Sequence, residues 1–546
     1  MAPGITVGCV QIYSALNMNR QRPDEERLAV APAARRYKSA PRREAAPASW
    51  ISLPYAVGLL QTYVQRHAGD PARFRFLAPV IDREDPARTA ERLAAADVVA
   101  LSVYVWNVRH SLAVAREVKR RRPETLVVLG GPQVPDRAAA FLREHPEVDV
   151  VIHGEGEAAF LALLETSVLE RSWEEVPSLT WLAPDGGLRS TPRAPRIADL
   201  QTVPSPYLEG VFDGMLRDRP EAVWMGLLET NRGCPFQCTF CDWGSAVASA
   251  VRCFDDARVR AEIEWLARQD VEYVFCCDAN FGILPRDVGI AEHVAAVHRA
   301  TGRPVTFVTQ ATKNATERSY RVQKTFAESG VQGAVTVSLQ SLDPHALELV
   351  KRSNISIASF MELLRRYARD GIPTYTDMIL GLPGETYDSW ANGLSTLVAS
   401  GQHGRIAFYS CSVLPNAEMG DPAYQRLHGM RLVSQRIIET HSSLVEADRH
   451  DVAEYLDVVV ETAALPAADW RRARVFAWLL ELCYYDRLVQ IPWALAGALW
   501  GVRARSQVEA LLNADRGRHP VLGGVLERFE QQAHAIQAGG SDLLPS

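Results

Sequence analysis

The stretch Arg232-Gly-Cys-Pro-Phe-Gln-Cys-Thr-Phe-Cys-Asp-Trp-Gly244 determines how the rest of the chain is interpreted. Its three cysteines, Cys234, Cys238 and Cys241, follow a C-x3-C-x2-C spacing. A loop with gaps of three and two residues can fold three thiolates around one centre. The usual full ligand set of an iron–sulfur cube is four cysteines, so three cysteines leave one iron without a protein ligand. Such an open iron can chelate a small molecule that carries an amine and a carboxylate.

Two other interpretations of these cysteines are open. A structural zinc site needs four ligands, usually as two pairs. Cys253 could supply a fourth ligand, but the sequence has no second Cys-x2-Cys pair. Unliganded thiols are common in protein cores, yet three within eight residues, beside Gly233 and Pro235, indicate a loop. The spacing therefore favours an iron–sulfur cluster.

Length and composition limit the classes of protein that need to be considered. A chain of 546 residues is too long for one core and suggests roughly two to four domains. The net charge of −6 does not indicate nucleic-acid binding. The sequence has no apolar run of about 18 residues, so it predicts no membrane span. The start of the chain lacks a charged and apolar signal sequence. Nine cysteines, an odd number, favour reduced thiols and a cytoplasmic location.

The first 200 residues alternate short apolar runs with amphipathic segments. This alternation predicts a doubly wound, Rossmann-like parallel sheet, whose ligands bind beyond the carboxyl ends of the strands. Strands are expected at 5–12, 97–104, 125–131 and 148–157, and helices at 53–66 and 110–121. The strand ends are then 104–107, 130–134 and 153–157.

Alternation begins again near residue 225, with six further strand–helix units. Their strands are expected at 226–233, 272–278, 305–310, 333–340, 374–381 and 406–413. After about residue 420 the pattern becomes helical, at 432–448, 470–489, 507–513 and 521–536. A helical cap over the site would exclude water from it. The expected domains are 1–200, 201–420 and 421–546, with a proline-containing linker at 165–220.

The cysteine stretch resembles the radical S-adenosylmethionine (SAM) enzymes, whose pattern has this spacing and an aromatic residue, here Phe240, before the last cysteine. The resemblance implies that Cys234, Cys238 and Cys241 hold a [4Fe–4S] cluster. It implies that the open iron binds the amino and carboxylate groups of SAM. It also implies that the six strand–helix units form a partial (β/α)6 barrel, with chemistry at the carboxyl ends of its strands.

The same resemblance suggests residues around SAM. The segment Leu380-Gly-Leu-Pro-Gly-Glu-Thr386, with Gly381 and Gly384, resembles the family's glycine motif near the adenine. Ser338 and Gln340 match positions that contact the ribose or amino-acid portion. Asp278 and Gln310 fall at the ends of the second and third strands. Polar residues on the rim of a barrel are also common without any contact to a ligand.

The N-terminal strand ends resemble the cobalamin-binding domain that precedes some radical SAM modules. Its two glycine turns match Gly130-Gly131-Pro132-Gln133 and Gly154-Glu155-Gly156-Glu157, where glycine permits close approach of backbone to a corrin. The histidine motif Asp-x-His-x-x-Gly is absent. Tyr104-Val-Trp106-Asn107 instead resembles the subgroup with a bulky residue beneath cobalt, and Trp106 is the candidate. The alternative is that Trp106 is a core aromatic.

Together these resemblances identify the chain as similar to the cobalamin-dependent radical SAM methylases of antibiotic biosynthesis. They imply methylation of an unactivated carbon or phosphorus atom of a small or peptide-like natural product, with methylcobalamin and an external one-electron reductant. Neither nucleic acid nor membrane is an expected partner. Four alternatives remain: a polar methylase of the tryptophan 2-methyltransferase type, a non-methylating cobalamin enzyme, a radical SAM enzyme with an empty N-terminal sheet, and a sensor.

Overall fold

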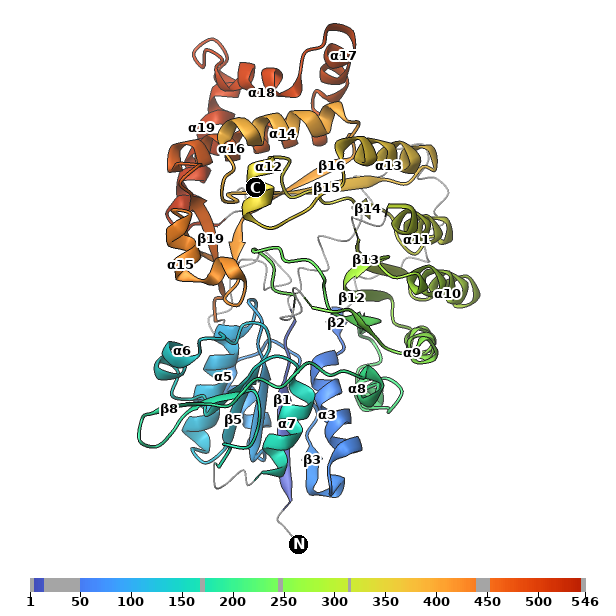
Figure 1. Cartoon of the computed structure of the whole chain (residues 1–546), viewed down its shortest axis with the longest axis vertical. Helices are drawn as coiled ribbons and strands as arrows, with labels where there is room; N and C mark the ends of the chain where they lie inside the picture. The colour runs from blue at the N-terminus through green and yellow to red at the C-terminus, as the bar shows by residue number, and fades with distance from the viewer. Residues whose placement is uncertain are drawn as a thin grey trace.

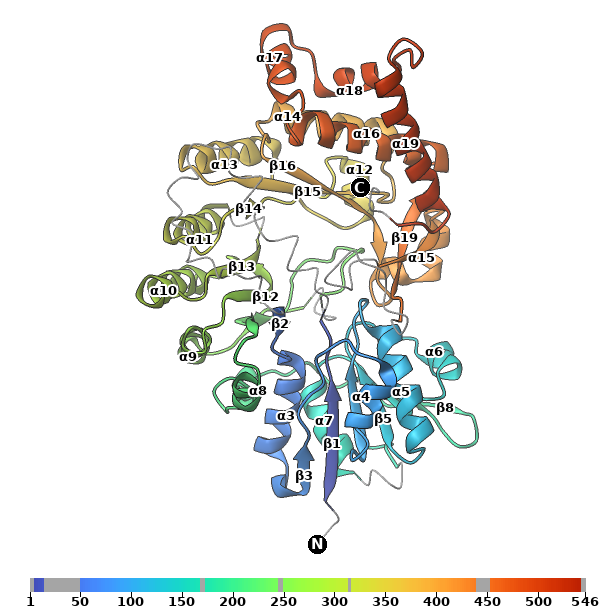
Figure 2. The same cartoon turned by 180° about the vertical axis from the view of Figure 1, so that it is seen from behind.

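The computed structural model describes residues 4–13, 50–166, 172–243, 249–312, 316–437 and 452–541. Figures 1 and 2 show an N-terminal sheet flanked by helices at one end of the molecule. A crescent of strands with helices along its outer side occupies the middle, and the C-terminal helices lie at the other end. Among the described residues, no helix is both long enough and apolar enough to cross a membrane.

The N-terminal sheet has the order β3-β1-β4-β5-β6-β7-β8. Its first five strands are parallel, and β7 and β8 add an antiparallel hairpin. All of Val98 to Leu101 in β4 is buried, as expected for a central parallel strand covered on both faces. The strands are β1 (Ile5–Val10), β3 (Phe74–Phe76), β4 (Val98–Ser102), β5 (Leu126–Gly130), β6 (Val150–Ile152), β7 (Leu179–Leu182) and β8 (Leu188–Ser190).

Helices cover both faces of this sheet, so the predicted doubly wound architecture is confirmed. On one face, α3 (Tyr55–His67) and α7 (Gly156–Glu165) share a core with β1 and β6. On the other face, α4 (Pro86–Arg92), α5 (Val108–Arg121) and α6 (Ala139–Glu144) share a core with β4 and β5. The region 165–220, expected to be a linker, contributes the β7–β8 hairpin to the sheet.

The six predicted barrel strands are all present. They form two parallel groups, β13-β12-β9-β2 and β14-β15-β16. The short strand β2 (Trp50–Ser52) comes from the N-terminal part of the chain and pairs with β9. The others are β9 (Val223–Leu228), β12 (Tyr273–Phe281), β13 (Thr306–Ala311), β14 (Val335–Thr336), β15 (Thr374–Leu380) and β16 (Arg405–Ser410). The partial barrel is therefore confirmed.

Helices cover the outer side of the barrel strands (Figure 1). They are α9 (Asp256–Arg268), α10 (Arg286–Thr301), α11 (Thr316–Ser329), α12 (Pro344–Leu349), α13 (Ile357–Arg369) and α14 (Tyr387–Ala399), with the short α8 (Asp213–Asp218) before β9. Beyond them, the C-terminal helices are α16 (Ala467–Leu480), α17 (Gln490–Trp500), α18 (Ala504–Leu512) and α19 (Pro520–Gln537). Trp390 of α14 donates to the carbonyl of Ala473 in α16 at 3.2 Å, which joins the two layers.

One predicted helix is wrong. Residues 432–436 of the expected helix at 432–448 belong to β18 (Arg431–Arg436), and residues 438–448 lie outside the described part of the chain. β18 pairs with β19 (Tyr455–Glu461), which also pairs with β17 (Ser412–Val413). A short apolar run does not distinguish helix from strand by its period, and pairing with the distant β19 decides the outcome. The short helix α15 (Pro422–Leu427) precedes this sheet.

Candidate active site

The cysteine loop leaves the barrel at the carboxyl end of β9, after the two-residue strand β10 (Asn231–Arg232). Gly233 has φ +126°, and a Cβ there would lie 2.3 Å from the Ala250 carbonyl oxygen, so only glycine fits. The Ser249 N–H donates to the Cys234 carbonyl at 2.8 Å. These contacts fix the first cysteine at the end of the strand.

The far end of the loop is attached to the opposite side of the barrel. The Thr239 N–H donates to the Val350 carbonyl at 3.1 Å, and the Met419 N–H donates to the Thr239 carbonyl at 2.9 Å. Phe240 packs against the apolar cluster that contains Val350 and Met419. The aromatic residue before Cys241 therefore anchors the loop across the open side of the barrel.

The three thiols have different surroundings. Cys234 is buried, whereas Cys238 and Cys241 are partly exposed. Among the described residues, no three His, Cys, Asp or Glu side chains are grouped for a single metal ion. A cube offers each thiolate its own iron, so its ligands need not converge on one point. Cys253, the possible fourth zinc ligand, lies on β11 (Arg252–Cys253) and pairs with Asn231.

Two nitrogen donors reach the cysteines. Asn280 on β12 donates from Nδ2 to Cys234 Sγ at 3.2 Å. Arg352, after α12, places Nη1 4.0 Å from Cys238 Sγ. Burial lowers the pKa of Arg352, and Cys238 and Cys241 oppose that effect. Sequence reasoning missed Arg352, because nothing in the local pattern connects it with the cysteines.

Asp278 is buried behind the cysteine loop. It accepts from the backbone N–H groups of Thr230 and Asn231 at 2.8 and 3.2 Å, and from both of their side chains. Burial raises the pKa of Asp278 to about 7, against the effect of these donors. The structure thus places this predicted site residue where it holds the turn into the cysteine loop.

The other residues predicted to surround SAM lie on the barrel strands or at their ends. Gln310 is on β13 and is half-buried. The Ser338 hydroxyl donates to Asp377, and the Ser338 carbonyl accepts from Arg352 at 3.0 Å. Gln340 has φ +66° and exchanges backbone hydrogen bonds with β15, to the Asp377 carbonyl and from the Ile379 N–H. Ser338 and Gln340 therefore lie beside the segment that holds Arg352.

Packing requires glycine at both positions of the 380–386 motif. Gly381 has φ +99°, and a Cβ there would lie 3.2 Å from the carbonyl oxygen of Val459 in β19. Gly384 has φ +85°, and a Cβ would lie 2.8 Å from Leu349 in α12. The motif thus permits close approach of β19 and α12 at the end of β15. A contact with adenine stays a prediction.

In the N-terminal half, Trp106 lies just after β4 and is held by defined contacts. Its ring stacks on Tyr104 with centroids 4.7 Å apart, and its Nε1 donates to the Ile12 carbonyl at 3.0 Å. Buried Asn107 accepts from the Tyr104 N–H at 2.7 Å and donates to the carbonyls of Ile12 and Ser102. Asn107 therefore shapes the loop that presents the two aromatic rings.

This loop faces the barrel. Burial raises the pKa of Tyr104, and Cys277 and Glu229 raise it further. Glu229 follows β9 and Cys277 lies on β12, so the Tyr104–Trp106 pair is close to the barrel strands that lead to the cluster loop. The position of Trp106 beneath cobalt stays a prediction.

The two glycine turns lie at the carboxyl ends of β5 and β6. Gly131 has φ +120°, and a Cβ there would lie 2.5 Å from the Val103 carbonyl, so the turn packs against the end of β4. The Pro132 carbonyl accepts a hydrogen bond from Asn416, which follows β17, at 3.0 Å. Gln133 is half-buried beside it. Gly154 has φ +72°, and no atom of the described residues lies within 4 Å of the position that a Cβ would take there. A contact of these turns with a corrin stays a prediction.

The acidic residues of the second turn contact the radical SAM half. Glu157, in the first turn of α7, forms an ion pair with Arg232 at 2.7 Å. Glu155 lies 3.8 Å from Arg232 and also pairs with Arg196 of the N-terminal part at 3.1 Å. Arg232 also contacts Glu229 at 3.0 Å. Burial lowers the pKa of Arg232, but the carboxylates of Glu157 and Glu229 outweigh this effect and raise the pKa above its usual range. One arginine, two residues before Cys234, therefore joins the two halves.

A second contact between the halves was missed from the sequence. Glu454, just before β19, is fully buried and accepts from the N–H groups of Arg109 and His110 at 2.9 and 2.8 Å. These N–H groups belong to the first turn of α5, where a carboxylate is favourable. Arg83 donates to the carbonyls of Trp106 and Val452, at 3.1 and 2.6 Å. The C-terminal region thus fixes the helix that follows Trp106.

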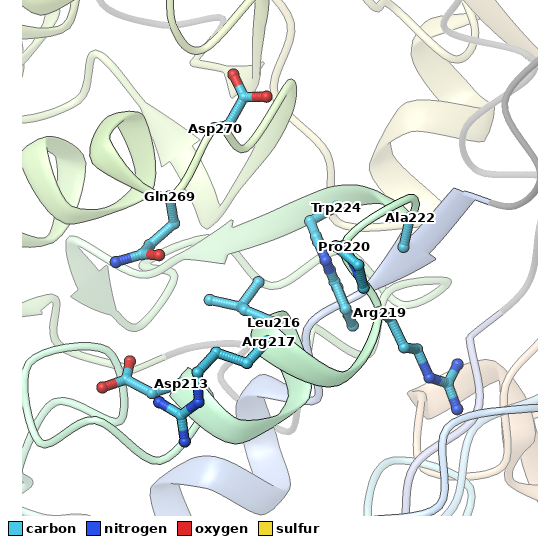
Figure 3. Close-up of a pocket in the computed structure, with 9 residues that line it drawn as sticks. All are labelled: Asp213, Leu216, Arg217, Arg219, Pro220, Ala222, Trp224, Gln269 and Asp270. Atoms are coloured by element: carbon cyan, nitrogen blue, oxygen red, sulfur yellow. The ribbon is translucent and has the colours of Figure 1, made fainter.

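A surface cavity of about 380 Å³ lies elsewhere. Figure 3 shows it between α8, the start of β9 and the turn after α9. Its lining includes Arg217, Trp224 and Asp270. Because the cysteine loop follows the opposite, carboxyl end of β9, this cavity is separate from the candidate site.

Comparisons with known proteins agree with this arrangement. Residues 61–164 match the B12 binding domain, and residues 228–395 match the Radical SAM superfamily. The first match contains Trp106 and both glycine turns. The second contains the three cysteines and the glycine motif at the end of β15.

Two curated relatives cover most of this chain. A cobalamin-dependent radical SAM methyltransferase, TokK, from Streptomyces tokunonensis is 40% identical over 80% of this chain and 65% of its own length. The 2-(S-pantetheinyl)-carbapenam-3-carboxylate methyltransferase of Streptantibioticus cattleyicolor is 41% identical over 77% of this chain and 61% of its own length. The chain thus spans a little under two thirds of the length of these relatives.

A solved structure shares the fold. TsrM from Kitasatospora setae, with cobalamin and a [4Fe–4S] cluster bound, has a TM-score of 0.57 and 16% identity, over 96% of this chain and 99% of that chain. The two family matches, and not this fold likeness, give the cofactors, which are a [4Fe–4S] cluster with SAM in the barrel half and cobalamin in the N-terminal half. The chain therefore combines a domain of the Radical SAM superfamily with a B12 binding domain.

Proposed function

We propose that the chain transfers a methyl group from cobalamin to an unactivated carbon or phosphorus atom of a small antibiotic intermediate. The observation that carries this proposal is the ion pair at 2.7 Å between Arg232 of the cysteine stretch and Glu157 of the second glycine turn. It ties the turn on the cobalamin side to the loop on the cluster side. Both relatives described above are named as methyltransferases.

The three cysteines and Trp106 have separate roles in this proposal. When bound, the cluster and one SAM would supply a 5′-deoxyadenosyl radical that takes a hydrogen from the substrate, the cobalamin would supply the methyl group, and a second SAM would restore the methyl group on cobalt. Cys234, Cys238 and Cys241 hold the cluster. The Trp106 ring is fixed by Tyr104 and by the Ile12 carbonyl, and it would pack against bound cobalamin and exclude water there.

The first substrate to test is a carbapenam carboxylate with a pantetheinyl thioether, the compound named for the Streptantibioticus relative. The electron comes from an external one-electron reductant. We place the protein in the cytoplasm, where its thiols stay reduced, and propose that it binds neither nucleic acid nor membrane.

The test is anaerobic reconstitution with iron, sulfide and methylcobalamin, followed by turnover with SAM that carries a deuterated methyl group. We expect a product that gains the labelled methyl group, together with 5′-deoxyadenosine. Cys238→Ala should abolish both products, whereas the matched control Cys253→Ser should retain them. Unchanged turnover in Cys238→Ala would refute the cluster role.

The same assay separates the alternatives. Labelled product without 5′-deoxyadenosine would contradict the radical route and support a polar methylase. 5′-Deoxyadenosine with a product that gains no mass would support a non-methylating enzyme. A chain that takes up no corrinoid would contradict the role of the N-terminal sheet.

A further inference from the structure

Two side chains from separate parts of the barrel direct nitrogen donors at two of the three cluster cysteines. Asn280 reaches Cys234 Sγ at 3.2 Å from β12. Arg352 reaches Cys238 Sγ at 4.0 Å from the segment after α12. Neither nitrogen belongs to the cysteine loop itself, so both are placed by the barrel.

Arg352 is held in position by neutral groups. Its Nη2 donates to the Ser338 carbonyl at 3.0 Å, and its Nε donates to Asn354 Oδ1 at 3.0 Å and to the Leu339 carbonyl at 3.3 Å. Within the described ranges, no carboxylate lies within the 4.0 Å ion-pair distance of its guanidinium. The Asp377 carboxylate favours the Arg352 cation only from beyond that distance, and a partly buried cation without a direct ionic partner is unfavourable. Thiolates of a bound cluster would supply the missing negative charge.

We propose that Arg352 and Asn280 set the reduction potential of the cluster. This inference rests on the cluster-binding role of the cysteines in the proposed function. One electron from the external reductant would make the cluster and its thiolates one charge more negative. This electron would then pass to the sulfonium of bound SAM, whose S–C5′ bond breaks to give methionine and the 5′-deoxyadenosyl radical. Net charge and hydrogen bonds to the sulfurs set such potentials. A cation and an N–H donor both favour the reduced state, so both raise the potential.

The test is a potentiometric titration of the full chain, reconstituted anaerobically without SAM and followed by EPR of the reduced cluster. At a fixed solution potential, Arg352→Met should lower the ratio of reduced to oxidised cluster at least tenfold. For one electron, this corresponds to a fall of 59 mV in the reduction potential of the cluster. Asn280→Leu should lower the potential less, because it removes a neutral donor. Arg352→Lys should keep most of the wild-type value, because the charge remains.

Lys351→Met is the matched control. Lys351 is the adjacent residue, but it is exposed and forms an ion pair with Glu418 at 2.6 Å, so its loss should leave the potential unchanged. If Arg352→Met does not retain a cluster, Asn280→Leu and Arg352→Lys decide the question.

Normal iron content with wild-type potentials in all cluster-holding variants would overturn this inference alone. Weaker binding of SAM by Arg352→Met at an unchanged potential would also overturn it, since the guanidinium would then act on SAM. Absence of iron from the wild-type chain would instead contradict the proposed function.

Discussion

Replacing Arg232 by methionine should loosen the junction between the cobalamin and radical SAM halves. The Arg232 side chain is 10% exposed and contacts Glu157 at 2.7 Å, Glu229 at 3.0 Å and Glu155 at 3.8 Å. Methionine keeps an apolar stem but removes the charge. Glu155 retains its ion pair with Arg196, so the loss falls on Glu157 and Glu229. Removing one partner of a buried ion pair costs about 3–5 kcal/mol, and we expect a value of about 3 kcal/mol.

The assay is urea unfolding of the apoprotein, with the single variants Arg232→Met and Glu157→Gln and the double variant. Residues in direct contact couple by about 0.5–3 kcal/mol, so the double variant should lose less stability than the sum of the two single variants. The matched control is Arg189→Met, which breaks an exposed ion pair with Asp185 and should cost less than about 1 kcal/mol. Additive losses, or an Arg232→Met curve that superimposes on wild type, would refute this reasoning.

Two further predictions concern buried carboxylates. Burial raises the pKa of Glu385 from 4.5 to about 8, so its contribution to folding is fully present below pH 4.5 and is lost as the pH rises through 8. Glu385→Gln should therefore gain about 1.4 kcal/mol of unfolding free energy over wild type per pH unit between these values. Urea unfolding at several pH values measures this gain. The control is Glu348→Gln, at an exposed carboxylate. If the unfolding free energies of Glu385→Gln and wild type changed in parallel with pH, the prediction would be contradicted. Glu454→Ala should expose the first turn of α5, because Arg109 and His110 lose their acceptor at 2.9 and 2.8 Å. Hydrogen exchange of these two N–H groups should be at least about tenfold faster, equivalent to about 1.4 kcal/mol, and unchanged exchange would show that Glu454 does not cap the helix.

Long parallel strands were predictable from the sequence because their side chains are buried on both faces. The run Val98 to Leu101 is one such strand. Several other strands were not predictable, and two of them show why. β2 has three residues, too few to show a period, and exists because it pairs with β9. β18 was read as helix, and its pairing with β19 is a contact that no local pattern encodes.

The candidate site also contains residues that the local sequence predicts and residues that it does not. Its cysteines and glycines were predictable because their spacing is local and the φ values at Gly131 and Gly381 demand glycine. Arg352 was not, since it is 114 residues from Cys238 along the chain. The glycine turn at 154–157 was recognised, but its sequence does not show that the Glu157 carboxylate forms an ion pair with Arg232 of the other half.

The central claim is that one chain holds both cofactors, and metal and corrinoid analysis of the anaerobically reconstituted protein tests it most directly. We expect about four irons, the content of one cube, and about one cobalamin per chain. Cys238→Ala should lose the iron and keep the corrinoid. Zinc in place of iron, or iron without corrinoid, would contradict the account.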